Sequence, residues 1–295
     1  MHVICSNPAV SAPNTEYIWD GFKKLDFMVV SDFFLSETAE FADVVLPATS
    51  WAEDEGTTTN LEGRVIRIRK VVEPIGESKP DWEIFKMIAE RMGKAHLFPY
   101  NNAREIFEEF RIASKGGKAD YYGITWERIE KEDGVFWPCP SEDHPGTPTM
   151  FKEKFGTPDG KANLAVVKWQ EPGEVPTPEY PHILTTGRVV FHYLSGSQTR
   201  RVDFLMEQCP LPYVEMHPEL ASQYNLLNGD KVKLTTKRSH MELEVRLTKA
   251  IRKDTIFVPY HWGKELAVNQ LTNPALDPTS RMPEFKVCSV KIEKI

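Results

Sequence analysis

The chain has 295 residues with 41% hydrophobic and 27% charged side chains, a composition typical of a globular protein of about two domains. Its net charge of -7 argues against bulk binding to nucleic acid or to an anionic membrane surface. No apolar run reaches the roughly 18 residues that a membrane-spanning helix needs, so we expect no membrane span.

The cysteines are scattered along the chain and lack metal-binding spacing. Cys5, Cys139, Cys209 and Cys288 form no C-x-x-C pair, so we expect no zinc site, no iron–sulfur site and no metal ligand within this chain. The N-terminus lacks the basic start and full apolar core of a signal peptide. Together these features predict a cytoplasmic protein with reduced thiols.

Short apolar strands and short helices alternate through the first part of the chain, which predicts a parallel α/β sheet. Strands are expected at residues 2–5, 27–30 and 42–47, and helical segments at 16–24 and 36–40. Asn7 and Asp32 follow the first two strands, where α/β folds bind ligands. Asp32 suits a ribose or a base edge, although a turn or helix-capping aspartate is the commoner alternative. The absence of G-x-G-x-x-G argues against an ordinary nicotinamide site.

Between residues 65 and 113 the spacing of apolar residues predicts one strand and two helices. Residues 65–69 alternate like a half-exposed strand, and the stretches 81–92 and 101–113 are spaced like amphipathic helices. Residues 120–175 lack periodicity and are rich in proline and aromatic side chains. We therefore expect an irregular segment that wraps over another part of a larger protein. Prolines at 172, 176, 178 and 181 predict an interdomain linker.

Beyond the linker, short strands follow one another with turn signals between them. They are expected at 183–186, 213–216, 231–236, 241–248, 255–259 and 286–292, with one helical interruption at 218–224. Strands of even length in this order predict a small β-barrel.

The loop at residues 187–201, GRVVFHYLSGSQTRR, follows the first of these strands. Gly196 allows close approach of a backbone, and the serine, glutamine and threonine side chains offer hydrogen-bond donors. Arg200 and Arg201 have planar guanidinium groups, which can donate two parallel hydrogen bonds to a phosphate. The loop is chemically fitted to a large, polar, phosphorylated ligand; the alternative is a surface hairpin with solvated arginines.

An ordered set of sequence blocks spans essentially all 295 residues. It comprises Asn7-Pro8 with Ser11, Asp32 with Glu37-Thr38, residues 42–47, Glu55-Gly56-Thr57, Asn60, Glu62-Gly63-Arg64, Pro80-Asp81-Trp82, residues 155–161, Gly187-Arg188, Thr199-Arg200-Arg201, Asn269 and residues 282–286. Through these blocks the chain resembles the C-terminal half of molybdopterin-dependent oxidoreductases of the dimethyl sulfoxide reductase superfamily.

The resemblance implies three segments and a cofactor. Residues 1–100 are similar to part of the family's α/β molybdopterin oxidoreductase domain, and residues 101–175 to an irregular and helical connecting segment. Residues 176–295 resemble the double-psi β-barrel that binds the dinucleotide. The implied cofactor is bis-molybdopterin guanine dinucleotide with molybdenum, or with tungsten in its place.

The resemblance also implies which residues contact this cofactor. We expect the guanosine end to contact Asn7, Asp32, Thr38 and Asp81, and the pterin side of the barrel to contain Gly187, Arg188 and His192. Pterin or pyrophosphate is expected to contact Gly196, Gln198, Thr199 and Arg200. Pterin edges are expected to contact Asn269 and Gln270, and a phosphate to contact Lys286. Simpler roles stand beside these: a core histidine at 192, turn chemistry at 269 and 270, and strand-edge protection by Lys286.

The family's [4Fe–4S] cluster and metal-ligating residue belong to an N-terminal half that these 295 residues do not contain, so no catalytic residue is expected here. The implied partners are that half, in the same or a separate chain, and an electron-transfer protein. The loop sequence favours nitrate reduction, because formate dehydrogenases more often have Met where this chain has Gln198. Formate oxidation and a non-catalytic, cofactor-binding split subunit are the alternatives.

Overall fold

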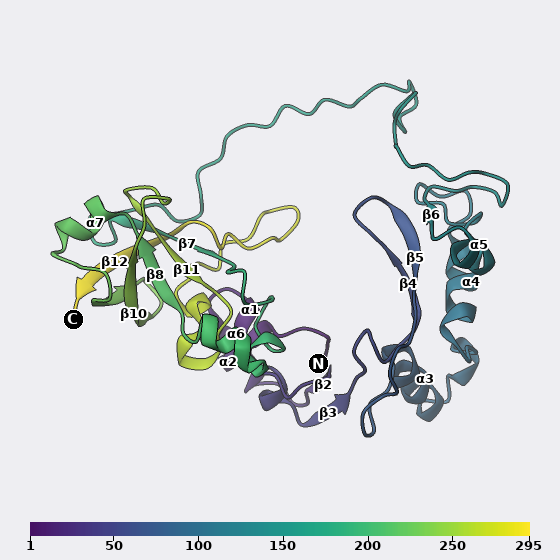
Figure 1. The fold of residues 1–295 in the computed structure, drawn as a ribbon, viewed down its shortest axis with the longest axis horizontal. Helices are drawn as coiled ribbons and strands as arrows, with labels where there is room; N and C mark the ends of the chain where they lie inside the picture. Colours follow the sequence, from purple (N-terminus) through teal and green to yellow (C-terminus); the bar gives the residue numbers. More distant parts are fainter. The chain divides into compact units, whose positions relative to one another are not determined.

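The computed structural model describes all 295 residues, which form two compact units (Figure 1). One unit joins Met1–Val45 to Trp169–Ile295, and the other is Leu46–Lys168. These units follow the packing of the chain, whereas the three predicted segments follow the family's organisation and stay a prediction.

A closed barrel of six strands dominates the first unit, in the order β10-β8-β11-β7-β12-β9. Its strands are β7 (His182–Gly187), β8 (Tyr213–Met216), β9 (Lys231–Thr235), β10 (His240–Leu247), β11 (Thr255–Pro259) and β12 (Cys288–Lys294). The pairs β7–β11 and β8–β10 are parallel, and the other four are antiparallel. Alternate side chains such as Leu184, Leu243 and Ile256 fill the interior, since successive residues of a strand face opposite sides. The predicted barrel is confirmed.

Short helices lie between the barrel strands along the sequence. They are η3 (Thr199–Arg201), α6 (Asp203–Gln208), α7 (Pro218–Gln223), η4 (Lys264–Leu266) and η5 (Val268–Gln270). Helix α7 confirms the predicted interruption, and Pro218 begins it because proline needs no amide hydrogen in the first turn.

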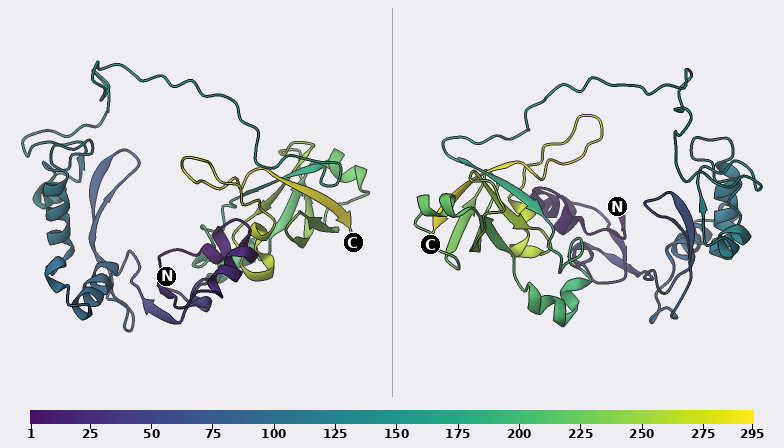
Figure 2. Two further views of the ribbon diagram at one scale, coloured as in Figure 1. Left: turned by 180° about the vertical axis from the view of Figure 1, so that it is seen from behind. Right: turned by 45° about the horizontal axis from the view of Figure 1, so that its top comes forward.

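The N-terminal segment packs with the barrel. It contains β1 (His2–Ile4), α1 (Pro8–Ser11), α2 (Thr15–Phe22), β2 (Val29–Asp32), η1 (Ala39–Phe41) and β3 (Val44–Pro47). The sheet order is β1-β2-β3, and β1 and β2 are parallel as predicted. Figure 2 shows α1 and α2 beside the barrel, and the Asn269 side chain donates to the Val10 carbonyl at 2.8 Å. This hydrogen bond joins the N-terminal segment to the barrel across 259 positions of the sequence.

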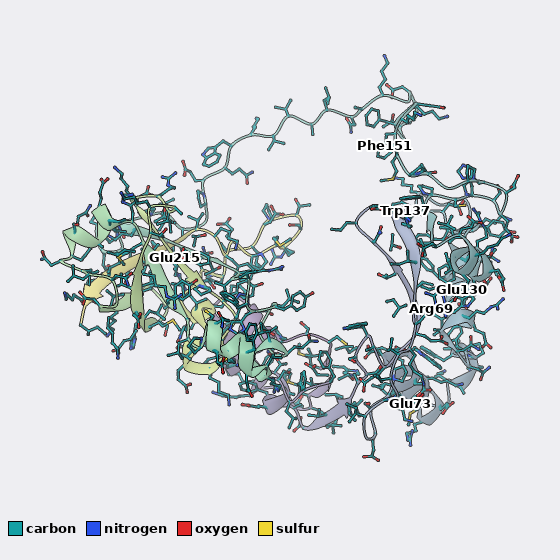
Figure 3. The ribbon with its side chains drawn as sticks, viewed as in Figure 1. Arg69, Glu73, Glu130, Trp137, Phe151 and Glu215 are labelled. Carbon is teal, nitrogen blue, oxygen red and sulfur yellow. The ribbon has the colours of Figure 1, made fainter.

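The second unit combines an antiparallel sheet, β4-β5-β6, with three α-helices. Its elements are β4 (Gly56–Thr59), β5 (Arg64–Ile68), α3 (Asp81–Arg91), η2 (Ala95–Leu97), α4 (Ala103–Ala113), α5 (Trp126–Lys131) and β6 (Val135–Phe136). Arg69, which directly follows β5, and Glu130 on α5 lie side by side, and Arg69 Nη2 donates to Glu130 Oε2 at 2.5 Å (Figure 3). The expectation of an irregular chain from residue 120 is wrong for α5 and β6, because elements this short show no periodicity. None of the helices is both long and apolar enough to cross a membrane.

Candidate functional site

Two neighbouring cavities of about 370 Å³ each lie in the barrel unit, and Ser11 and Tyr260 line both. The first is formed after β1 and β2 and by the loop before η3; the second lies at the end of β7. The first is lined by Asn7, Asp32, Phe33, Tyr193 and Gln198, among others, and the second by Gly187, Arg188, Asn269, Phe285 and Lys286.

Two cations lie together in the second cavity without a carboxylate partner. Arg188 Nε donates to the Tyr260 hydroxyl at 2.9 Å, and the Lys286 ammonium donates to the carbonyl of Thr186. Burial lowers the pKa of Lys286, and the nearby Arg188 lowers it further. Arg188 and Lys286 are both exposed to solvent, and two uncompensated positive charges at one cavity attract an anion.

Asp32 lines the first cavity but already accepts hydrogen bonds at both carboxylate oxygens. Its Oδ1 accepts from the Phe33 amide at 2.8 Å, and its Oδ2 accepts from the Ser36 hydroxyl at 3.0 Å. The carboxylate therefore fixes the turn after β2, which is the simpler of its two predicted roles. Its contact with a nucleotide stays a prediction.

Asn7, Glu37 and Arg200 form a part-buried hydrogen-bond network beside the first cavity. Asn7 Nδ2 donates to Glu37 Oε2 at 2.7 Å and to Ser197 Oγ at 3.2 Å. Arg200 Nη2 donates to Glu37 Oε1 at 2.5 Å. Burial by itself would raise the pKa of Glu37, but the hydrogen bonds from Asn7 and Arg200 outweigh it and the pKa is lowered. The network ties the N-terminal segment to the barrel and uses Nη2 of Arg200. The contact of Arg200 with pterin or pyrophosphate stays a prediction.

Thr38 and Gly196 contact members of this network. The Thr38 amide and hydroxyl both donate to Asn7 Oδ1, at 3.1 and 2.8 Å. Gly196 has a φ of 76°, and a Cβ there would collide with the His261 carbonyl and with Arg200. Glycine at this position therefore allows the close packing of His261 and Arg200. The close approach of Gly196 to a ligand stays a prediction.

Neither cavity is lined by four other predicted residues: His192, Thr199, Gln270 and Asp81. His192 is buried: its Nε2 donates to the Cys209 carbonyl at 2.8 Å, and Nδ1 lies 3.1 Å from Thr199 Oγ1. Gln270 is buried too, and donates to the Glu265 carbonyl at 3.0 Å. Asp81 belongs to the other unit, where it begins α3. Cofactor contacts of these residues stay predictions.

Glu37, Tyr260 and Ser11 complete the site but were not predicted as site residues. Tyr260 directly follows β11, and residues at strand ends are frequent ligand contacts, so its position was a usable signal. Ser11 and Glu37 lie in the sequence blocks that carry the resemblance. Nothing local in the sequence indicated that Glu37 meets Arg200, which is 163 residues away.

Replacing Glu37 by glutamine is expected to lower the free energy of unfolding by about 2 kcal/mol, since Arg200 would lose its charged partner. The Arg200 and Glu37 side chains are only 21% and 13% exposed, so solvent screens this pair little. Urea unfolding measures the change. Glu40→Gln is the matched control, because the Lys264–Glu40 pair is 57% and 51% exposed and should contribute less than about 1 kcal/mol. Equal losses in both variants would contradict the expectation.

A mixed-strand barrel with two adjoining cavities, one of them cationic, defines a binding unit for a large anionic ligand. Comparisons with known families agree with this. The family described as "Molydopterin dinucleotide binding domain" matches residues 183–289, and "Molybdopterin oxidoreductase" matches residues 1–91. The chain belongs to the molybdopterin oxidoreductase family.

Two curated relatives show how the chain compares with longer proteins. It is 47% identical to the assimilatory nitrate reductase catalytic subunit of Bacillus subtilis (strain 168), over 99% of this chain and 41% of that protein. It is 44% identical to the F420-dependent formate dehydrogenase subunit alpha of Methanocaldococcus jannaschii, over 100% of this chain and 43% of that protein. The chain therefore spans about two fifths of the length of these relatives.

The fold recurs in a solved structure, acetylene hydratase from Pelobacter acetylenicus, with a TM-score of 0.77 and 22% identity. The match covers 100% of this chain and 44% of that one and shows a common fold. Family membership indicates bis-molybdopterin guanine dinucleotide, with molybdenum, as the cofactor. The residues present fit such a group, because Arg188 and Lys286 lack acidic partners and Arg200 Nε is buried without a hydrogen bond.

Proposed function

We propose that this chain is the C-terminal, cofactor-binding part of a cytoplasmic molybdenum oxidoreductase, most specifically a nitrate reductase. The observation that carries the proposal is the pair of unneutralised cations, Arg188 and Lys286, in a cavity that adjoins a second one. In this proposal residues 176–295 are a double-psi barrel, residues 1–100 part of the α/β domain, and residues 101–175 the connection.

The two cavities suit different parts of a guanine dinucleotide. In the second cavity, Arg188 and Lys286 would hold an anionic group, and the Asn269 amide and the Gly187 backbone would contact pterin edges. In the first cavity, Asn7 would contact the guanosine beside Asp32, and Gln198 would contact pterin or pyrophosphate. We propose that Asp32 or Asp81 reads guanine, since a carboxylate accepts two hydrogen bonds from N1–H and the 2-amino group.

The task of these residues is to bind and orient the cofactor, not to react. When bound, the cofactor supplies the two-electron chemistry in which nitrate, two electrons and two protons yield nitrite and water. The [4Fe–4S] cluster, the metal-ligating residue and the contact with an electron donor would come from the N-terminal half. The chain by itself is therefore expected to be inactive.

Nucleotide titration of the full chain tests the binding proposal. GDP is expected to bind at least about tenfold more tightly than ADP, because only guanine offers adjacent N1–H and amino donors. Isothermal calorimetry at fixed salt measures both affinities. Equal affinities, or no binding of either nucleotide, would contradict the assignment.

Formate dehydrogenase is the second candidate, since a formate dehydrogenase subunit is a relative at 44% identity. Gln198 lines the first cavity, and the resemblance favours nitrate at this position. An enzyme completed with its N-terminal half, supplied in the same chain or separately, is expected to reduce nitrate and not to oxidise formate. Formate oxidation without nitrate reduction would reverse the preference. Nucleotide binding without either activity in the completed enzyme would favour the non-catalytic split subunit.

A further inference from the structure

His261 is a fully buried residue of the barrel unit. It follows Tyr260, which lines both cavities, and the two rings stack at 5.0 Å between centroids. His261 Nδ1 lies 2.6 Å from the Leu194 carbonyl, and Nε2 lies 2.8 Å from the Val189 amide nitrogen. One imidazole therefore holds both ends of the loop segment that connects Arg188 to Ser195.

The partners of the ring determine its protonation. A carbonyl oxygen only accepts, so Nδ1 must carry the hydrogen that bonds to Leu194. A backbone amide only donates, so Nε2 must present a lone pair to Val189. The arrangement requires a neutral ring in a single tautomer. Protonation at Nε2 would set two N–H groups against each other and break the contact with Val189.

The surroundings of the ring also oppose a positive charge. The ring of His192 lies 5.7 Å away between centroids, and the guanidinium groups of Arg188 and Arg200 face the same region. Burial lowers the pKa of His261, and the neighbouring His192, Arg188 and Arg200 lower it further, against the hydrogen bond to Leu194, which raises it. The nearby carboxylate of Glu37, which lies against Gly263, is already paired with Arg200.

We propose that His261 is a positioning residue of the cofactor site, whose neutral ring fixes the loop from Val189 to Leu194 and thereby sets Arg188 and Tyr193 at the two cavities. Loss of this geometry on protonation weakens nucleotide binding at acid pH. The proposal rests on the proposed function, because it assumes that the two cavities hold the dinucleotide.

The direction of the pH effect follows from linkage. His261 has a lower pKa in the folded chain than its ordinary value of 6.5, so the unfolded chain binds the proton more tightly. The stabilisation is complete above about pH 6.5 and is lost as the pH falls from there through the folded-state pKa. His182 behaves similarly, since burial lowers its pKa too, but its partner is Tyr224 and it lines neither cavity.

The test compares the full wild-type chain with His261→Gln, His261→Phe and the control His182→Gln. GDP affinity is measured by calorimetry between pH 5 and pH 8, where titration of GDP itself affects every variant equally. We expect His261→Phe to weaken binding about tenfold at pH 7.5, since both loop contacts are lost. His261→Gln keeps an acceptor for Val189 and does not titrate, so it should bind more tightly than His261→Phe and lose less affinity in acid than the wild type.

The control and a spectroscopic readout separate positioning from general stability. His182→Gln should keep the wild-type pH profile of GDP binding. Nitrogen-15 chemical shifts of the His261 ring at pH 7.5 should show a protonated Nδ1 and an unprotonated Nε2; any other state would overturn the proposal. Wild-type binding with an identical pH profile in His261→Gln would overturn only the positioning role. A wild-type chain that binds no GDP at any pH would overturn the proposed function and this inference with it.

Discussion

Replacing both Arg188 and Lys286 by alanine is expected to weaken the binding of inorganic pyrophosphate by about a hundredfold. Each cation can form a charge-assisted hydrogen bond with an anion, and each such bond contributes about 1.5 to 3 kcal/mol. Neither side chain has a carboxylate partner in the structure, so the double variant leaves no acid unpaired. Removal of two like charges should leave stability unchanged or slightly improved.

Calorimetric titration of the full chain with pyrophosphate at fixed salt measures this loss. Arg252→Ala with Lys253→Ala is the matched control, because it removes two positive charges from an exposed site away from both cavities. This control should bind pyrophosphate within about twofold of the wild type, since exposed charges act weakly over distance. Equal weakening in both double variants would show a general charge effect and contradict the cation pair as the anion site.

Replacing Glu174 by alanine is expected to lower the free energy of unfolding by about 3 kcal/mol. Its side chain is 5% exposed and that of Arg238 is 13% exposed, so the pair is buried. Glu174 accepts from Arg238 at 2.8 and 3.3 Å and from the buried Ser289 at 2.9 Å. Its loss leaves an unpaired guanidinium inside the barrel unit, and removal of one partner of a buried pair is strongly destabilising.

Urea unfolding of the variants tests this expectation. Glu174→Gln should lose less, because the amide oxygen still accepts one of the hydrogen bonds. Glu293→Ala on β12 is the control: the Lys291–Glu293 pair is 47% and 44% exposed and should contribute less than about 1 kcal/mol. If Glu174→Ala and Glu293→Ala lower the free energy of unfolding equally, the buried Glu174–Arg238 pair does not contribute the expected stability.

The elements that were predicted well are those whose signal is local. Strand β10 alternates buried and exposed residues along its length, and the predicted strand at 241–248 differs from it by one residue at each end. Helix α4 has a regular apolar stripe, and Asn102 caps it by accepting from the Glu105 amide at 3.0 Å. By contrast α5 and β6 have 6 and 2 residues, too few to show a period, and both contact β5.

The sequence by itself determined the barrel strands, the parallel pair β1–β2 and the family, because strand periodicity and ordered blocks are properties of the chain read in order. Only the tertiary structure decided which polar side chains line the two cavities. Arg188 and Lys286 are 98 positions apart and reach one cavity through the closure of the barrel. Arg200 meets Glu37 from the N-terminal segment, because a part-buried guanidinium is stabilised by a charged hydrogen-bond partner, and its contact with a phosphate stays a prediction.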